Sequence, residues 1–184
     1  MDKNKHRLNV ADIITLLRIF GTVLLLLFKP LTPGFFCVYA LTGLTDVLDG
    51  WIARKTKTAG EFGARLDSIA DLLFYTVMLI RLLPVLLSKL PNEIWYAVAA
   101  VFCVRISAYV TAAIKYRRFA SLHTFLNKFT GVAVFLIPFL LITDGAVVFC
   151  FIVSAVAMAA SLEELVIHIR CKEYSQNVKS IFYV

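Results

Sequence analysis

Charged residues are scarce in this chain of 184 residues, at 17% of the sequence against about 25% in a typical soluble protein. Hydrophobic residues reach 60%, above the roughly 45–50% of soluble domains. The four cysteines are scattered, without the close C-x-x-C pairing of a structural metal site. The sequence also contains no internal repeat and no low-complexity segment. These absences argue against a soluble domain, a cysteine-based metal site and a repeat protein.

Long apolar runs account for the excess of hydrophobic residues. A helix that crosses the hydrocarbon layer needs about 20 mostly apolar residues. Six such runs are found, over residues 10–29, 33–53, 67–89, 93–115, 124–143 and 146–169. The fold predicted is therefore an all-α integral membrane protein with six transmembrane helices. We expect one domain over residues 1–184, with an N-terminal interfacial segment (1–9) and a C-terminal tail (172–184).

Two features of these runs need comment. The first run is too long for a signal peptide and lacks a small-residue cleavage site, so we expect it to remain as a helix. Pro84 and Pro138 fall inside apolar runs, where membrane helices tolerate proline.

The basic residues predict the orientation in the membrane. Most of the 19 Lys and Arg residues lie at the two chain ends and in the second and fourth connections, whereas the other connections contain only Lys29 and Lys89. This asymmetry places both termini on the cytoplasmic side of the cell membrane. The net charge of +7 is then explained by topology and by attraction to anionic lipid. We expect no nucleic-acid partner.

Four aspartates interrupt this apolar background, in two pairs. Asp46 and Asp49 are three residues apart, and Asp67 and Asp71 are four apart. On helices, each spacing places two carboxylates on one face. Because a short connection makes neighbouring helices antiparallel, we expect the two pairs to face one another at the cytoplasmic end of the second and third spans.

Four carboxylates in one pocket repel one another unless cations neutralise them. Hard divalent ions with oxygen ligands, Mg²⁺ or Mn²⁺, suit this set, and two ions would balance the charge. Paired ions are the recurring device for displacement at phosphorus. Gly50 and Ala53 leave room for a substrate, Gly63 is expected to form a tight turn, and Arg54 can grip a phosphate.

The spacing of these residues resembles a known signature. Residues 46–71 match D-x2-D-G-x2-A-R-x8-G-x3-D-x3-D, the pattern of the CDP-alcohol phosphatidyltransferases, at every fixed position. The six spans and the chain length are similar to those of bacterial members. The resemblance implies an enzyme that transfers a phosphatidyl group from CDP-diacylglycerol to a small alcohol and releases CMP. It also implies a homodimer in the membrane.

The resemblance implies roles for individual residues. Asp71 would be the catalytic base that takes the proton of the acceptor hydroxyl. The metal ligands would be Asp46, Asp49, Asp67 and Asp71. The residues implied in binding the CDP-lipid are Asp12, Thr15, Asp46, Gly50, Ala53, Arg54 and Gly63.

A second, weaker resemblance lies near the N-terminus. The family pattern N-x-P-N-x-L-T-x-x-R is matched at Thr15 and Arg18, but Ala11 replaces the proline and Asp12 replaces the second asparagine. One interpretation is that this segment lines the nucleotide pocket. The other is that Asp12 caps a helix and Arg18 extends to the membrane surface.

The acceptor alcohol is less clearly indicated. Basic residues near the cytoplasmic face favour a phosphorylated polyol, so glycerol 3-phosphate is the leading acceptor, as in phosphatidylglycerophosphate synthases. The candidate acceptor-binding residues are Arg105, Arg118, His123 and Lys128. Their alternative explanation is membrane topology alone. Inositol phosphate, inositol, serine and other alcohols remain open, because Leu72 stands where many glycerol-phosphate members have lysine.

Two other classes of protein share some of these features. An ion-coupled transporter also carries intramembrane carboxylates, but these are usually spread over several helices, often with inverted repeats. A non-catalytic scaffold leaves the four aspartates without a role. The clustering of the aspartates at one end, beside Gly50 and Arg54, favours the enzyme. Among the remaining polar residues, we expect Arg81 to be structural and Glu164 to pair with His168.

Overall fold

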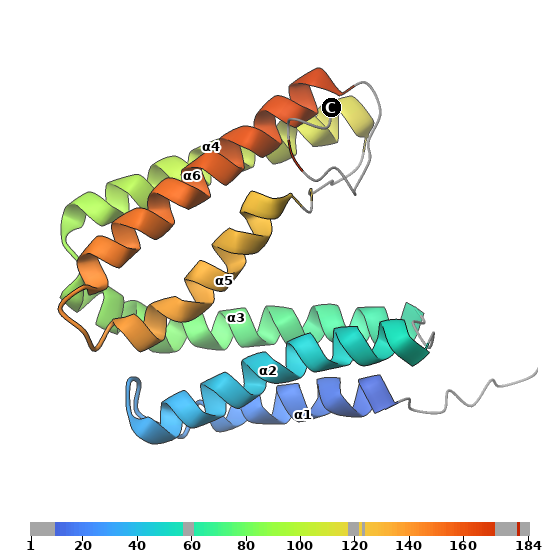
Figure 1. Ribbon diagram of the computed structural model, residues 1–184, viewed down its shortest axis with the longest axis vertical. Coiled ribbons are helices and arrows are strands. Elements are labelled where there is room, and N and C mark those ends of the chain that lie inside the picture. Colours follow the sequence, from blue (N-terminus) through green and yellow to red (C-terminus); the bar gives the residue numbers. More distant parts are fainter. Residues whose placement is uncertain (1–9, 57–60, 118–121, 123, 172–179, 181–184) are drawn as a thin grey trace, which may run out of the picture. The chain divides into compact units, whose positions relative to one another are not determined.

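The computed structural model describes residues 10–56, 61–117, 122, 124–171 and 180. Within this part the chain forms six helices, shown in Figure 1. They are α1 (Val10–Leu24), α2 (Pro33–Thr56), α3 (Glu61–Lys89), α4 (Asn92–Tyr116), α5 (Phe125–Leu140) and α6 (Ala146–Arg170). The chain divides into two compact units, Met1–Ser88 and Lys89–Val184. The first contains α1, α2 and nearly all of α3, and the second contains α4, α5 and α6.

The all-helical prediction is confirmed for the described residues, and each apolar run contains one helix. Four boundaries differ from the prediction by three residues or more: the ends of α1, α2 and α5 and the start of α3. Helix α1 ends at Leu24 rather than residue 29, because the chain tightens there: Leu26 N donates to Val23 O at 3.1 Å and Leu27 N donates to Leu24 O at 3.0 Å. Helix α3 begins at Glu61 rather than residue 67. The expected tight turn at Gly63 is therefore wrong, because this glycine lies inside α3.

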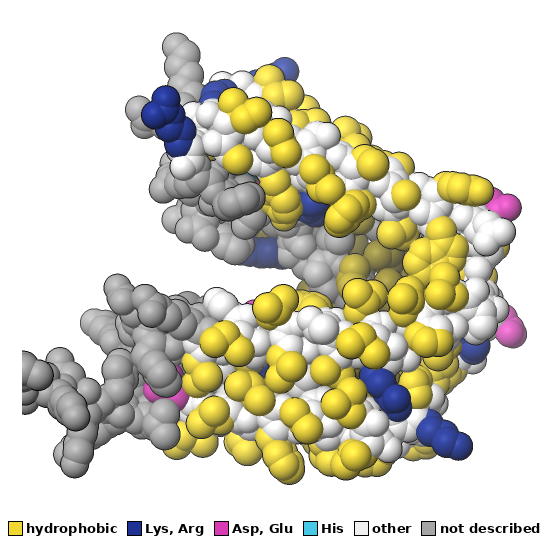
Figure 2. All heavy atoms as spheres, turned by 180° about the vertical axis from the view of Figure 1, so that it is seen from behind, with side chains coloured by type: hydrophobic (Ala, Val, Ile, Leu, Met, Phe, Trp, Pro, Cys, Tyr) yellow, Lys and Arg dark blue, Asp and Glu magenta, His cyan; other side chains and the backbone are white. Residues whose placement is uncertain are grey.

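Three of the described helices are long and apolar enough to cross a membrane: residues Leu66–Lys89 of α3, all of α4 and all of α6. Helices α1 and α5 have 15 and 16 residues, or about 22–24 Å at 1.5 Å per residue, which is shorter than the roughly 30 Å hydrocarbon layer. Hydrophobic side chains cover much of the face seen in Figure 2. These features fit a membrane protein, whereas six spans remain a prediction.

The first unit is held together by a close helix crossing and a column of aromatic rings. Where α1 packs on α2, a methyl group in place of the Gly21 hydrogen would lie 2.5 Å from Thr42 Oγ1, so a larger residue would require a shift at this crossing. Tyr39 of α2 stacks on Phe35 at 6.0 Å and on Phe74 of α3 at 5.6 Å between ring centroids. Since Phe74 follows Asp71 by three residues, this stacking fixes α3 against α2 close to the aspartates.

The second unit packs through small side chains, as membrane helices often do. Helix α6 packs against both α4 and α5. Ala108 and Ala112 of α4 and Ala160 and Ser161 of α6 are all fully buried, which allows a close approach of the backbones. Pro138 lies inside α5 and Pro84 inside α3 of the first unit, and both helices continue through the proline.

Candidate functional site

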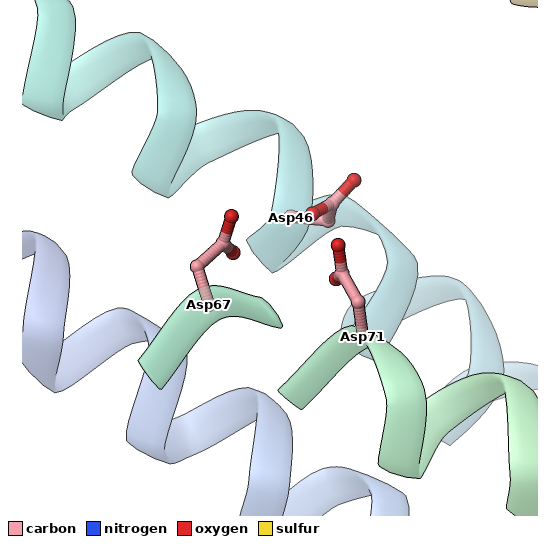
Figure 3. Close-up of side chains that lie close together, drawn as sticks. All are labelled: Asp46, Asp67 and Asp71. Carbon is pink, nitrogen blue, oxygen red and sulfur yellow. The ribbon is translucent and has the colours of Figure 1, made fainter. Parts of the chain in front are cut away.

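Three of the four aspartates come together at one place in the first unit. Asp46 of α2 and Asp67 and Asp71 of α3 each offer a carboxylate oxygen, and these oxygens lie within 4.8 Å of one another. Figure 3 shows the three side chains converging from the two helices. The antiparallel arrangement of α2 and α3 and the four-residue spacing on α3 produce this geometry. The side chains remain accessible, because each is about half exposed.

Arg18 of α1 contacts all three carboxylates through one nitrogen atom. Its Nη1 lies 3.0 Å from Asp46 Oδ1, 2.9 Å from Asp67 Oδ1 and 2.6 Å from Asp71 Oδ1. The guanidinium is buried, with 1% of the side chain exposed. A buried arginine on an apolar helix requires such partners. The membrane-surface interpretation of Arg18 is therefore wrong, and all three helices of the unit converge on this cluster.

The donor set of the cluster fits a hard divalent cation. One guanidinium cannot neutralise three carboxylates, and two like charges about 4 Å apart repel by about 4 kcal/mol near a protein surface. Carboxylate oxygens are the ligands that such ions prefer, and one oxygen from each of the three aspartates lies within 4.8 Å of the other two. Asp46, Asp67 and Asp71 could hold such an ion, and the exposed side of the cluster could admit phosphate oxygens.

The predicted CDP-lipid residues are only partly described. Asp49, Gly50, Ala53 and Arg54 lie on α2, and their side chains are outside the described part of the structure. The α1 residues Asp12 and Thr15 are buried. Gly63 faces Asp12: a methyl group in place of its hydrogen would lie 2.9 Å from Asp12 Oδ1. Gly63 therefore lies beside the Asp12 side chain within α3 rather than in a turn.

The predicted acceptor residues belong to the second unit. Arg118 and His123 lie outside the described residues. Lys128 is exposed on the first turn of α5. Arg105 is not a free cation: its guanidinium is bound to Glu164 and donates to Asn127 Oδ1 at 2.9 Å. Arg81 of the first unit donates to the Phe28 carbonyl oxygen, which agrees with the structural role predicted for it.

Two residues of interest were missed by sequence reasoning. Arg18 matched the N-terminal family pattern and is buried in an apolar helix, and both signals could have suggested an acidic partner. Glu164 was paired only with His168, which lies 3.8 Å away. Its main partner, Arg105, is 59 residues distant along the chain. The available signal was an arginine, Arg105, within one apolar run and a glutamate pair, Glu163 and Glu164, within another.

A family model supports the resemblance drawn from the aspartates. The model described as CDP-alcohol phosphatidyltransferase matches residues 8–166, which include Arg18 and all four aspartates. No solved structure shows significant similarity to the chain.

Relatives with assigned names match shorter segments. A CDP-diacylglycerol–serine O-phosphatidyltransferase of Methanocaldococcus jannaschii is 39% identical over 70 residues, covering 38% of this chain and 32% of that protein. A CDP-diacylglycerol–glycerol-3-phosphate 3-phosphatidyltransferase of Pseudomonas fluorescens is 35% identical over 80 residues, covering 41% of each chain. A CDP-diacylglycerol–inositol 3-phosphatidyltransferase of Schizosaccharomyces pombe is 38% identical over 63 residues, covering 34% of this chain and 27% of that protein. The matched part thus spans less than half the length of these relatives.

Proposed function

The chain belongs to the CDP-alcohol phosphatidyltransferase family, and from this premise we propose that it moves the phosphatidyl group of CDP-diacylglycerol to a small alcohol and releases CMP. The observation that carries the proposal is the convergence of Asp46, Asp67 and Asp71 within 4.8 Å. An accessible group of carboxylates at the end of apolar helices suits a substrate with a diphosphate head and lipid tails.

The proposed reaction is a displacement at phosphorus. The acceptor hydroxyl oxygen forms a bond to the phosphorus that carries diacylglycerol, and the bond from that phosphorus to the bridging oxygen breaks. CMP leaves with the bridging oxygen. Asp71 accepts the hydroxyl proton as general base, a role that requires a carboxylate within hydrogen-bond reach of the acceptor. Its side chain is 42% exposed, so it is accessible to a small alcohol.

The remaining residues of the site are proposed to bind and orient. Asp46, Asp49, Asp67 and Asp71 would hold two Mg²⁺ or Mn²⁺ ions, which supply charge neutralisation at the diphosphate when bound. Gly50, Ala53 and Arg54 would contact the CDP group, with Asp12, Thr15 and Gly63 alongside. Arg18 is proposed as a positioning residue, because its contacts hold Asp46, Asp67 and Asp71 together.

Glycerol 3-phosphate is the acceptor we propose. The exposed Lys128 can attract a phosphorylated alcohol, with Arg118 and His123 as further candidates, whereas Arg105 is already bound to Glu164. The relatives named above act on glycerol 3-phosphate, serine or inositol, so the family name alone does not select among them.

The arrangement of the chain in the membrane and its oligomeric state are also proposed. Six membrane spans in a single domain are proposed from the six apolar runs, and cytoplasmic termini with a cytoplasmic active site are proposed from the distribution of basic residues. A plasma-membrane homodimer is proposed from the family resemblance.

Product analysis tests the acceptor. Purified protein is given CDP-diacylglycerol, Mg²⁺ and, in separate reactions, glycerol 3-phosphate, inositol phosphate, inositol or serine, and the lipid product is identified by mass spectrometry. We expect phosphatidylglycerophosphate from glycerol 3-phosphate. A product from serine or inositol alone would replace this acceptor while leaving the reaction type intact.

A further inference from the structure

Glu164 of α6 is a fully buried carboxylate at the centre of the second unit, with 0% of its side chain exposed. It accepts hydrogen bonds from three separate segments. The donors are Arg105 Nη1 of α4, Asn127 Nδ2 of α5 at 3.1 Å, and the backbone N–H of Leu122, in the α4–α5 connection, at 3.0 Å. One side chain of α6 thus connects α4, α5 and the described part of the segment between them.

The donors of Glu164 are also bonded to one another. Arg105 Nη1 donates to Asn127 Oδ1 at 2.9 Å, and Asn127 Nδ2 donates to the Leu122 carbonyl oxygen at 2.9 Å. The backbone N–H of Asn127 donates to Thr124 Oγ1 at 3.2 Å, which caps α5. Asn127 is therefore held by its side chain and by its backbone, so the first turn of α5 has a fixed position relative to α4 and α6.

Because this network is buried, each charged group in it needs a partner. Removing one partner of a buried ion pair leaves an uncompensated charge, and hydrogen bonds to charged groups are stronger than neutral ones. Glu164 has no exposed surface, so it cannot contact a substrate itself. Any effect of Glu164 on a substrate must be transmitted through the residues that it holds.

Lys128 is the basic residue whose position this network can fix. It follows Asn127 directly and is exposed on the first turn of α5. Two other cations of the same unit are already engaged: Arg105 is bound to Glu164, and Lys115 Nζ donates to the carbonyl oxygens of His168 and Ile169 at 2.9 and 2.7 Å.

We propose that Glu164 is a positioning residue for acceptor recognition, which holds the start of α5 so that Lys128 contacts the phosphate of a phosphorylated acceptor. This inference rests on the proposed function. It assigns a role to the buried Arg105–Glu164–Asn127 network that membrane topology and local helix pairing do not explain.

Steady-state kinetics with glycerol 3-phosphate and CDP-diacylglycerol as the two varied substrates test the proposal. Glu164→Gln should raise the KM for glycerol 3-phosphate by about tenfold. This is the effect expected if Lys128 loses its charge-assisted hydrogen bond to the acceptor phosphate. The KM for CDP-diacylglycerol should change by less than about twofold. Asn127→Ala leaves the Arg105–Glu164 pair in place and should also raise the KM for glycerol 3-phosphate without changing the KM for CDP-diacylglycerol. This variant replaces Glu164→Gln in the test if Glu164→Gln does not fold.

The matched control is Glu163→Gln, the same substitution one position earlier on α6. Glu163 Oε1 accepts from Ser180 Oγ at 2.7 Å, so neither KM should change. The inference would be overturned if the wild type is active but the Glu164 and Asn127 variants change both KM values equally or change neither KM value. That result would leave the proposed function intact. Activity with serine or inositol but not glycerol 3-phosphate would also overturn the inference. A wild type that releases no CMP with any acceptor would overturn both this inference and the proposed function.

Discussion

Arg18 brings charges from three helices to one point. Its Nη1 lies between 2.6 and 3.0 Å from Asp46, Asp67 and Asp71. In the absence of a competing cation, this buried guanidinium offsets part of the repulsion among the carboxylates. A divalent ion would use the same oxygens, so Arg18 and the ion compete for them while both favour a compact cluster.

Replacing Arg18 with methionine tests this competition. Because the carboxylates are half exposed, we expect a loss of stability between about 1 kcal/mol, typical of exposed pairs, and about 3–5 kcal/mol, typical of buried ones. Thermal unfolding in detergent should show a lower Tm for Arg18→Met than for wild type without metal. Added Mg²⁺ should raise the Tm of the variant more than that of wild type. Equal Tm values under both conditions would contradict the role given to Arg18.

Asp71 is the residue on which the proposed chemistry depends most. Asp71→Asn keeps the size of the side chain but removes the general base, so CMP release should fall by about 10²–10⁴-fold. The Tm should stay near that of wild type, since Asp46 and Asp67 still contact Arg18. Asp144→Asn, at an exposed turn, is the matched control and should retain full activity. A wild-type rate in Asp71→Asn would exclude the base assignment.

At the residue scale, the sequence reveals candidate site residues better than it reveals their partners. The spacing of Asp46, Asp67 and Asp71 follows from helix periodicity, so their approach could be predicted. The partners of Arg18 lie 28, 49 and 53 residues away, and no local rule selects them. Glu164 illustrates the same limit, because the four-residue rule found His168 but not Arg105.

Helix boundaries depend on more than hydrophobicity. Apolar leucines continue beyond Leu24, yet the backbone leaves the helix there, ahead of Pro30 and Pro33. Polar residues between 61 and 66 resemble a loop in a hydropathy reading, although Glu, Ala and Arg are good helix formers, and α3 includes them. The centres of the helices and the bounds of α4 and α6 could therefore be predicted, whereas the end of α1 and the start of α3 could not.

The crossing of α1 and α2 depends on Gly21. Gly21→Ala would place a methyl group 2.5 Å from Thr42 Oγ1, so either the Thr42 side chain or the helices must shift and the Tm should fall. Adding Thr42→Ala removes the clashing hydroxyl and should restore most of the loss. Thermal unfolding of the single and double variants measures this coupling.

Gly131 provides the comparison for this substitution. It lies inside α5 with nothing within 4 Å of an added methyl group, so Gly131→Ala should be neutral or should stabilise by up to about 1 kcal/mol. A similar loss of stability in Gly21→Ala and Gly131→Ala would mean that the α1–α2 contact is not the cause.

The surface of the whole molecule suits lipid rather than water. Large apolar side chains such as Leu27, Ile114 and Tyr96 are more than 70% exposed, and Figure 2 shows many of this type on one face. Membrane helices satisfy their backbone hydrogen bonds internally, which allows this exposure. Composition could predict the membrane location, but the number of spans depends on helix lengths that composition does not determine.

Labelling of introduced cysteines tests the orientation. In a cysteine-free background and sealed right-side-out vesicles, Asp144→Cys should react with a membrane-impermeant maleimide, because the α5–α6 turn is expected outside. Arg117→Cys, at the end of α4, should react only after permeabilisation. The reverse pattern would invert the topology and place the aspartate cluster on the wrong side for the proposed cytoplasmic site.

Metal-dependent release of CMP tests the central claim most directly. Purified protein is incubated with CDP-diacylglycerol and the acceptor panel in the presence of Mg²⁺ or Mn²⁺, and CMP and the new phospholipid are quantified together. We predict equal amounts of the two products, loss of both on chelation of the metal, and recovery when the ion is restored. Failure to form either product with any acceptor, or unchanged rates after the metal is removed, would contradict a metal-dependent phosphatidyl transfer at the aspartate cluster.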